Sequence, residues 1–228
     1  MTLYRAEILT GLTEQHLFCR QDGFKLHKEV AGPFSALCAA ANADGIDIKI
    51  VSSFRSYQRQ ADIWQAKLSG KRAVLDMHGN TVNITTLSGK ARLDAVLLYS
   101  ALPGASRHHW GTELDIYDAG AVENGYQPRL APQEYASDGP FDALQQWLTE
   151  HADAFGFFLP YQHYQGGVAA EPWHLSYQPL AQQYLAAFSP SILKHCLTQH
   201  PIAEQTLVLE HLDEIFNQYV SNICTSAA

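Results

Sequence analysis

The stretch that most constrains the fold is SRHHWGTELD, residues 106–115. It places an imidazole, His108, and a carboxylate, Asp115, on either side of a turn that contains Gly111. Alternating polar and apolar residues follow this turn, which predicts a half-buried strand over residues 113–117. Because side chains alternate between the two faces of a strand, Asp115 points away from the apolar face. We therefore expect Asp115 to project from a rigid strand and His108 to return to it across the loop.

A second short segment, EPWH at residues 171–174, supplies a further imidazole and a second carboxylate. It enters another predicted strand, with its proline at the strand entry, where a missing N–H is tolerated. A catalytic zinc site has three protein ligands, an open position for water and a nearby base. We expect the ligands to be His108, Asp115 and His174. Glu171, on the bend before the strand, is the expected base.

Three segments, in order along the chain, resemble signatures of the VanY-type D-alanyl-D-alanine carboxypeptidases. SRHHWGTELD resembles the pattern S-x-H-x-x-G-x-A-x-D, and EPWH resembles E-x-x-H. Residues 53–56 together with Gln60 resemble S-x-x-R-S-x-x-x-Q. The resemblance spans residues 52–177 and implies a zinc peptidase with the fold of D-Ala-D-Ala peptidases, the sonic hedgehog amino-terminal domain and lysostaphin-like enzymes. Glu113 departs from the pattern, which has a small residue there.

Composition limits the class of protein and its partners. The chain has 228 residues, 46% of them hydrophobic and 17% charged, which suits one globular domain with a substantial core. The net charge of −8 argues against nucleic acid or an anionic membrane surface as the main partner. It also favours a small fragment over an anionic wall polymer as the substrate. No stretch approaches the roughly twenty apolar residues that span a bilayer.

The amino-terminal sequence and the cysteines indicate the compartment. Residues 1–18 lack the basic segment and apolar run of a signal peptide. The four cysteines are scattered and form no CxxC pair, which favours reduced thiols in a cytoplasmic protein. A chain whose leader had been removed would look the same, so an exported or periplasmic protein is the alternative. The sequence does not indicate an oligomeric state.

Apolar periodicity predicts an α+β fold. Helical spacing occurs over residues 3–19, 27–43, 57–68, 90–101 and 141–155. Strand patterns occur over residues 46–51, 113–117, 156–161 and 173–177. Glycine-rich and polar residues predict a loop with a short hairpin at the active-site rim over residues 70–90, and an irregular insertion over 118–140.

We therefore predict a single domain with a small, mainly antiparallel sheet that carries the zinc site and is flanked by helices. Residues 1–178 form the catalytic domain. Residues 179–228 form a helical carboxy-terminal extension that packs on the same domain; a dimer interface is the alternative role for the extension.

Five side chains are expected to contact the substrate. Arg55 follows a strand and precedes a helix, so it points into a cleft, where it can stabilise the oxyanion or bind a terminal carboxylate. Gln60 lies at helical spacing along the same cleft wall, Ser106 can bond the substrate backbone, and Trp173 packs beside the site. Glu113 shares a strand face with Asp115, so we expect its carboxylate in the cleft, where it tunes substrate choice; a solvated residue at the rim is the alternative.

The expected function is hydrolysis of a peptide bond next to a D-amino acid, with one zinc ion per chain. A carboxypeptidase that removes a terminal D-alanine from a cell-wall peptide or muropeptide fits best, whether the bond is D,D or L,D. An endopeptidase of the phage-lysin kind is one alternative, although no wall-binding module is visible. A non-catalytic zinc module is another, but a structural site needs no base such as Glu171.

Overall fold

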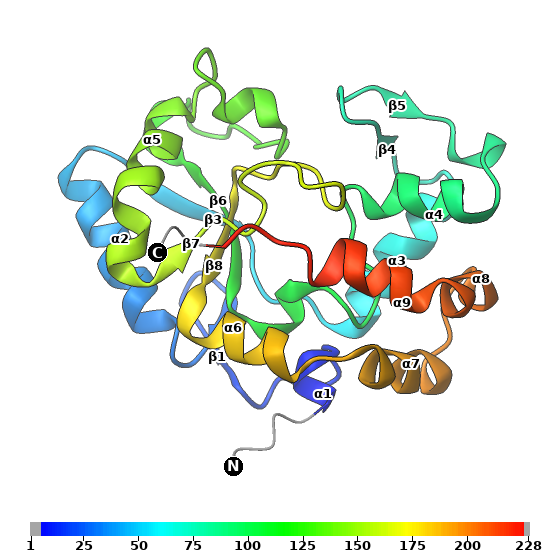
Figure 1. The fold of residues 1–228 in the computed structure, drawn as a ribbon. Coiled ribbons are helices and arrows are strands. Elements are labelled where there is room, and N and C mark those ends of the chain that lie inside the picture. Colours follow the sequence, from blue (N-terminus) through cyan, green and yellow to red (C-terminus); the bar gives the residue numbers. More distant parts are fainter. Residues whose placement is uncertain (1–5, 226–228) are drawn as a thin grey trace.

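An antiparallel sheet of four strands lies at the centre of the fold (Figure 1). The computed structural model describes residues 6–225 of the 228-residue chain. The strands have the spatial order β3-β6-β8-β7, and each neighbouring pair is antiparallel. Their bounds are Ile48–Ser52 for β3, Glu113–Asp118 for β6, Phe157–Phe158 for β7 and His174–Tyr177 for β8. The predicted α+β class with a small antiparallel sheet is confirmed.

Two short hairpins lie outside this sheet. They pair β1 (Leu17–Cys19) with β2 (Lys25–His27), and β4 (Val74–Leu75) with β5 (Thr81–Val82). The second is the short hairpin predicted within residues 70–90. Leu75 and the turn residues 77–79 line the large cavity that contains the candidate site, so this hairpin forms part of its rim.

Helices account for most of the remaining regular structure. The longer ones are α2 (Ala31–Ala43), α3 (Tyr57–Leu68), α4 (Gly89–Leu97), α5 (Asp142–His151), α6 (Gln178–Ala187) and α7 (Pro190–Gln199). The shorter ones are α1 (Ala6–Leu9), α8 (Gln205–Glu210) and α9 (Leu212–Ile215). Single turns of other helix types are η1 (Ile84–Thr86), η2 (Arg107–Trp110), η3 (Ala119–Ala121), η4 (Pro132–Tyr135), η5 (Ala152–Phe155) and η6 (Phe216–Val220). Helix α3 has the predicted bounds, and the Ser56 hydroxyl caps it by accepting the backbone N–H of Arg59 at 3.2 Å.

The helices pack against both sides of the sheet. Figure 1 shows α2 and α5 on one side, and α3, α4 and α7–α9 on the other. Phe34 of α2 meets Phe157 of β7 edge to face, with ring centroids 6.2 Å apart. On the other side the buried Trp64 of α3 donates its indole N–H to the carbonyl of Ala203 at 3.0 Å. Each such buried aromatic contributes about 1.5–3 kcal/mol.

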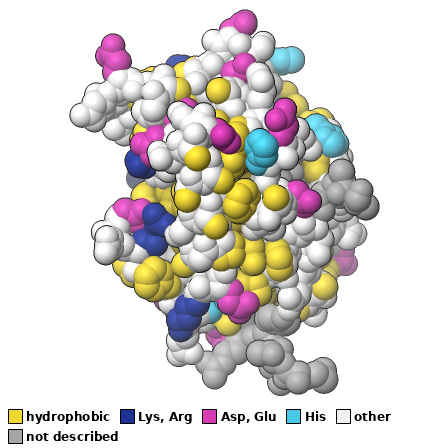
Figure 2. Space-filling model, turned by 90° about the vertical axis from the view of Figure 1, so that its left-hand side faces the viewer, with side chains coloured by type: hydrophobic (Ala, Val, Ile, Leu, Met, Phe, Trp, Pro, Cys, Tyr) yellow, Lys and Arg dark blue, Asp and Glu magenta, His cyan; other side chains and the backbone are white. Residues whose placement is uncertain are grey.

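The carboxy-terminal helices share the core of the rest of the protein. Apolar side chains from before and after residue 178 belong to one continuous cluster within the described residues. The division of the chain into 1–178 and 179–228 stays a prediction. The face on the side of α2 and α5 carries scattered charged side chains of both signs (Figure 2). Among the described residues, no helix is both long enough and apolar enough to cross a membrane.

The predicted amino-terminal helix over residues 3–19 is wrong. Residues 3–5 lie outside the described residues, and α1 ends at Leu9. Gly11 has a φ of +75°, and a Cβ there would lie 2.3 Å from the ring of His109. The chain therefore turns away from the helical path at this glycine. It continues into β1, which pairs with β2, so the next predicted helix also begins late, at Ala31.

Candidate active site

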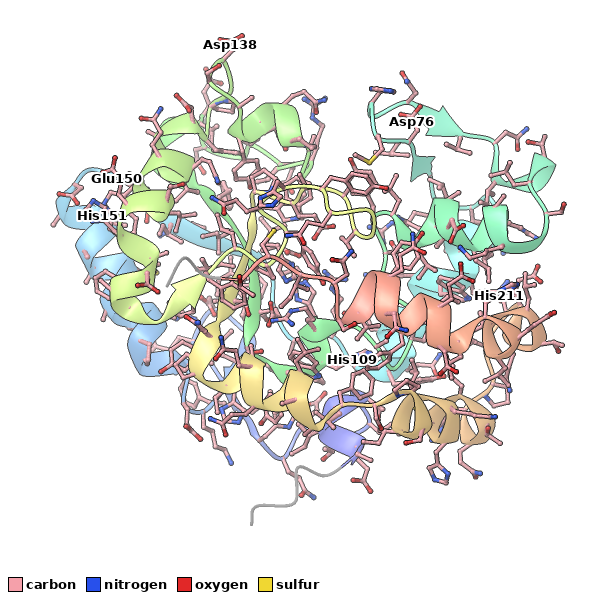
Figure 3. The ribbon with its side chains drawn as sticks, viewed as in Figure 1. Asp76, His109, Asp138, Glu150, His151 and His211 are labelled. Atoms are coloured by element: carbon pink, nitrogen blue, oxygen red, sulfur yellow. The ribbon has the colours of Figure 1, made fainter. Side chains whose placement is uncertain are left out.

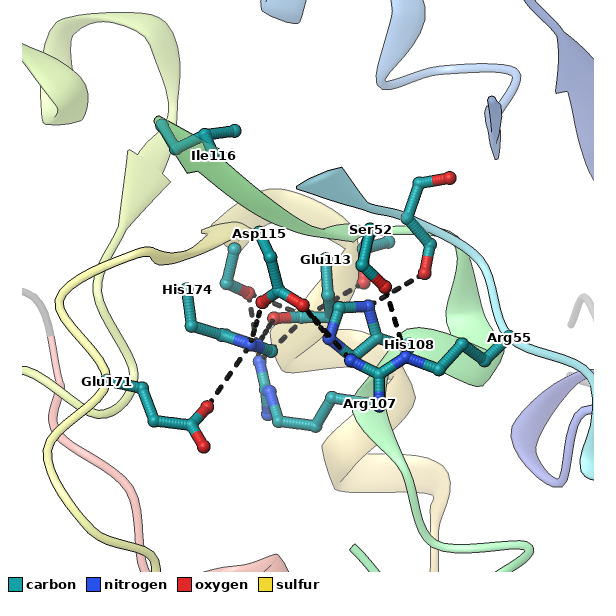
Figure 4. Close-up of polar contacts among 12 residues, drawn as sticks. Ser52, Arg55, Arg107, His108, Glu113, Asp115, Ile116, Glu171 and His174 are labelled. Atoms are coloured by element: carbon teal, nitrogen blue, oxygen red, sulfur yellow. Dashed lines mark hydrogen bonds and ion pairs between the residues drawn. The ribbon is translucent and has the colours of Figure 1, made fainter. Parts of the chain in front are cut away.

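The register of the central sheet brings two of the expected ligands together. Asp115 of β6 lies directly opposite His174 of β8 in the antiparallel ladder. His108 comes from η2, the single turn that precedes β6. One donor atom from each of these buried side chains lies within 4.8 Å of the others, so the three could hold a metal ion (Figure 4).

Gly111 makes the turn between His108 and Asp115 possible. Its φ is +70°, a conformation that glycine adopts without strain. A Cβ at this position would lie 2.8 Å from the backbone nitrogen of His27 and 2.5 Å from a methyl group of Leu17. The Gly111 carbonyl accepts the N–H of His27 at 2.8 Å. The turn is therefore fixed against the β1–β2 hairpin.

Hydrogen bonds decide which imidazole nitrogens face the shared point. His108 Nδ1 donates to the carbonyl of Ser53 at 2.8 Å, which leaves Nε2 as the ligand atom, 3.4 Å from Asp115 Oδ2. His174 Nε2 donates to Glu113 Oε2 at 2.8 Å, which leaves Nδ1 as the ligand atom, 3.1 Å from Asp115 Oδ1. A tetrahedral zinc ion with N and O ligands at about 2.0–2.2 Å holds those atoms roughly 3.3–3.6 Å apart. The donor set therefore fits zinc, and the two distances to the Asp115 oxygens lie close to this range.

Glu113 does not face the cleft, contrary to the sequence-based expectation. It is fully buried, and besides His174 its carboxylate accepts hydrogen bonds from Arg107 at 3.2 Å, Ser176 at 2.8 Å and Thr112 at 3.0 Å. Burial would raise the pKa of Glu113, but the Arg107 charge and the His174 hydrogen bond outweigh it and lower the pKa to about 2. The side chains of His174 and Ser176 on the neighbouring strand β8, together with Arg107, surround the Glu113 carboxylate, so it lies behind His174 and not in the cleft.

His174 lies between two buried carboxylates. Burial alone would lower its pKa, but the hydrogen bonds to Asp115 and Glu113 raise the pKa to about 9 in the absence of a metal. The same hydrogen bonds and the neighbouring His108 hold the pKa of Asp115 well below its ordinary value, against the effect of burial. Asp115 therefore stays ionised at neutral pH, as a carboxylate ligand of a divalent cation must.

Glu171 lies beside the ligands on the turn that leads into β8. Its backbone N–H donates to Tyr161 at 2.8 Å, and its carbonyl accepts the N–H of His174 at 3.0 Å. One carboxylate oxygen lies 3.6 Å from His174 Nδ1 (Figure 4). Burial raises the pKa of Glu171 to about 7. A carboxyl group with this pKa, next to a metal ligand and at the cavity wall, can accept and return a proton near neutral pH.

Arg55 faces the same point and is held by three contacts. Its guanidinium donates to the Ser52 hydroxyl at 3.1 Å, to Gln60 Oε1 at 3.3 Å and to Asp115 Oδ2 at 3.0 Å. Gln60 is fully buried, and its amide also donates to the Ala101 carbonyl at 2.7 Å. The structure therefore places Gln60 behind Arg55 rather than along the cleft wall.

His109 and Arg107 are two buried residues beside His108 that were not among the expected site residues. His109 lies inside the molecule (Figure 3), where Nδ1 donates to the Arg55 carbonyl at 2.6 Å and Nε2 accepts the N–H of Gly104 at 3.1 Å. It thus joins the arginine segment to the metal-binding turn. Arg107, 2% exposed, balances the charge of Glu113. Their positions next to His108 in the sequence were the one indication that both residues lie near the site. A histidine or arginine in a loop is ordinarily exposed, so this indication was weak.

A cavity of about 1220 Å³ opens onto these residues. His108, Asp115, Glu171 and His174 line it together with the two remaining predicted contacts, Ser106 and Trp173. The buried Ser106 hydroxyl has no hydrogen-bond partner among the described residues, and its contact with a substrate stays a prediction. Trp173 packs on Tyr135, with ring centroids 5.7 Å apart.

Comparisons with known proteins agree with this geometry. A family model described as "VanY: D-alanyl-D-alanine carboxypeptidase" matches residues 23–180. A protein of Haemophilus influenzae, described as uncharacterised, is 40% identical over 121 residues, which cover 52% of this chain and 92% of that protein.

Two solved structures share the fold. VanYB in complex with D-alanine-D-alanine has a TM-score of 0.53 and 21% identity, and the match covers 81% of this chain and 88% of that one. The vancomycin-resistance D,D-pentapeptidase VanY in complex with Zn(II) has a TM-score of 0.51 and 22% identity, with 75% of this chain and 86% of that one covered.

Proposed function

We propose, because the chain belongs to the VanY family of D-alanyl-D-alanine carboxypeptidases, that it is a zinc-dependent carboxypeptidase that removes a C-terminal D-alanine from cell-wall peptides or muropeptides. The observation that carries this proposal is the joint placement of His108, Asp115 and His174 around one point, with Glu171 beside them. A ligand set of two imidazoles and one carboxylate leaves a coordination position for water, as catalytic zinc sites do.

Zinc bound by His108 Nε2, an Asp115 oxygen and His174 Nδ1 would lower the pKa of a bound water and polarise the scissile carbonyl. Glu171 then serves as the general base: it accepts a proton from the attacking water and passes it to the leaving amine. In the metal-free protein burial raises the pKa of Glu171 to about 7, so this carboxyl group can hold and release a proton near neutral pH.

Arg55 supplies positive charge close to the ligands. Its Nη2 already lies 3.0 Å from Asp115 Oδ2, so the guanidinium is directed at the reaction centre. Charge-assisted hydrogen bonds from such a group stabilise the oxyanion that develops on the scissile carbonyl. Gln60 and Ser52 hold the guanidinium in this orientation. The open cavity and the placement of Glu171 both argue against a purely structural zinc site, which needs neither.

Mass spectrometry of defined peptides tests the proposal. Zinc-loaded protein is incubated with tripeptide, tetrapeptide and pentapeptide stems, each as the free acid and as the C-terminal amide. A carboxypeptidase should release a single terminal residue from the free acids and spare the amides. Internal cleavage of both forms would instead identify an endopeptidase, and intact peptides throughout would reject peptidase activity.

A further inference from the structure

We propose that Arg59, Lys67 and Arg72 form a subsite that binds a carboxylate of the substrate on one wall of the cavity. The inference rests on the proposed function and adds a requirement for a second anionic group on the peptide, away from the scissile bond.

Helix α3 turns one face toward the cavity. Arg59, Ile63 and Lys67 are spaced four residues apart, so they lie in a row along the helix, and all three line the cavity. Arg72 follows shortly after the helix ends and lines the same wall. This wall belongs to the cavity that contains His108 and Glu171, so a peptide bound at the reaction centre can reach it.

The distribution of charge singles out this cavity. The chain has a net charge of −8, with 15 Lys and Arg residues against 23 Asp and Glu residues. Seven of the basic residues line the cavity, but only three of the acidic ones do. The basic residues are Lys25, Arg55, Arg59, Lys67, Arg72, Arg107 and Arg129, and the acidic ones are Glu14, Asp115 and Glu171. The cavity therefore attracts anions even though the whole chain is acidic, which revises the charge argument made from composition.

Four of these seven cations have carboxylate partners. The pairs are Lys25 with Glu14, Arg55 with Asp115, Arg107 with Glu113 and Arg129 with Glu134. In contrast, no described residue forms an ion pair or hydrogen bond with the side chains of Arg59, Lys67 or Arg72. The three unpaired cations therefore keep their bonding capacity for a ligand.

Lys67 is the central observation, because it is only 7% exposed. Most of the side chain is buried, while its ammonium nitrogen is not among the fully buried atoms that lack a partner, so it remains accessible from the cavity that Lys67 lines. Burial and the nearby charge of Arg72 lower the pKa of Lys67 to about 8, while Glu171 acts in the opposite direction. A lysine that served only the helix dipole could extend its ammonium group into solvent. Lys67 instead lies in the wall of the cavity, where an anionic ligand can form an ion pair with its ammonium group.

The anions of a peptide are carboxylates, and two of them can occupy this subsite. One is the C-terminal carboxylate of the residue released; the other is an acidic side chain on a residue before the scissile bond. Both would form charge-assisted hydrogen bonds with the Lys67 ammonium and the arginine guanidinium groups. The chemistry is shared, so the test separates the two sources.

Binding is measured by calorimetry on zinc-loaded Glu171→Gln protein, which retains the cavity without hydrolysing its ligand. Three peptides are compared: acetyl-L-Glu-D-Ala-D-Ala, the same peptide with glutamine in place of glutamate, and the same peptide with an amidated C-terminus. One of the two neutral replacements should weaken binding about tenfold or more, which identifies the carboxylate that the subsite binds.

The same three peptides are then measured with Lys67→Met added. The loss of affinity caused by neutralising the recognised carboxylate should fall to less than about twofold in the Lys67→Met variant. The Lys67→Arg variant should show the full loss of affinity again. Lys90→Met, which removes a lysine outside the cavity that pairs with Asp94, is the matched control and should leave the penalty unchanged.

Equal penalties with and without Lys67→Met, no penalty for either replacement, or no binding of any peptide would overturn the subsite. Hydrolysis by the wild-type protein is a separate readout. If the protein binds a peptide carboxylate through Lys67 but the wild type hydrolyses no peptide, the proposed function is rejected and the subsite is kept. If the wild type releases the terminal residue but binding does not depend on Lys67, the subsite is rejected and the proposed function is kept.

Discussion

Replacing Glu113 with alanine tests the buried network behind His174. The change restores the small residue of the pattern that the chain resembles. It removes the acceptor of His174 Nε2 and the carboxylate partner of Arg107, whose Nη2 keeps only the Ser176 hydroxyl as an acceptor. Loss of a partner that orients a ligating histidine typically weakens metal binding about 10–100-fold. Removal of one member of a buried ion pair costs about 3–5 kcal/mol. The upper part of that range applies here, because Arg107 Nε and Nη1 are already buried without partners.

Two assays separate these effects. Zinc affinity is measured by competition with a chromophoric chelator, and the free energy of unfolding is measured in urea on metal-free protein. Glu113→Ala should lower both. Adding Arg107→Met removes the uncompensated charge, so the double variant should regain most of the stability. It should not regain zinc affinity, because His174 still lacks its hydrogen-bond acceptor.

The double variant also supplies the refutation. Recovery of zinc affinity together with stability would mean that Glu113 acts only through the fold. A Glu113→Ala protein with unchanged zinc affinity and stability would mean that the network has no energetic role. The relative rates among peptide substrates should not change in the single variant Glu113→Ala, because Glu113 does not line the cavity.

Three further predictions follow from the same geometry. Changing His108, Asp115 or His174 singly to alanine should lower zinc content and activity together. Full zinc occupancy in one of these variants, measured by elemental analysis, would mean that the changed residue is not a ligand. Lys67→Met should stabilise the metal-free protein by up to about 3 kcal/mol at pH 7 in urea unfolding, because a folded-state pKa of about 8 lies below the ordinary 10.5. The folded state then binds fewer protons between these values, so the stability gain should be full below pH 8 and disappear as the pH rises through 10.5; a gain that grows with pH would contradict this sign. Arg55→Lys should lower kcat/KM about tenfold or more in steady-state assays with zinc content unchanged, since a lysine cannot reproduce the three contacts of the guanidinium.

The placement of two of the three expected ligands, His108 and Asp115, was within reach of sequence reasoning because it depends on local rules. Period two places Asp115 on one face of its strand, and Gly111 forces the turn that returns His108. Helix α3 was also predictable, because Ser56 caps it and its apolar spacing is regular. In each of these cases the deciding interactions lie within about ten residues of one another.

The missed features depend on contacts between distant parts of the chain. Glu113 is buried by side chains of the neighbouring strand β8, some sixty residues later in the sequence, and periodicity alone does not predict these contacts. The expected helix over residues 3–19 has suitable apolar spacing, but Gly11 must accommodate the ring of His109. A lysine on an amphipathic helix is normally solvated, and the burial of Lys67 becomes visible only in the three-dimensional structure.

The proposed assignment of Glu171 as the base of a zinc peptidase is tested most directly by comparing wild type with Glu171→Gln. Both proteins are loaded with zinc, the metal content is measured by elemental analysis, and D-alanine release from a peptide ending in D-Ala-D-Ala is followed by mass spectrometry. The geometry predicts one zinc ion per chain in both proteins and a loss of activity of roughly a hundredfold or more in the variant. Equal D-alanine release by the two proteins at equal zinc content, or loss of zinc from the variant, would contradict this assignment.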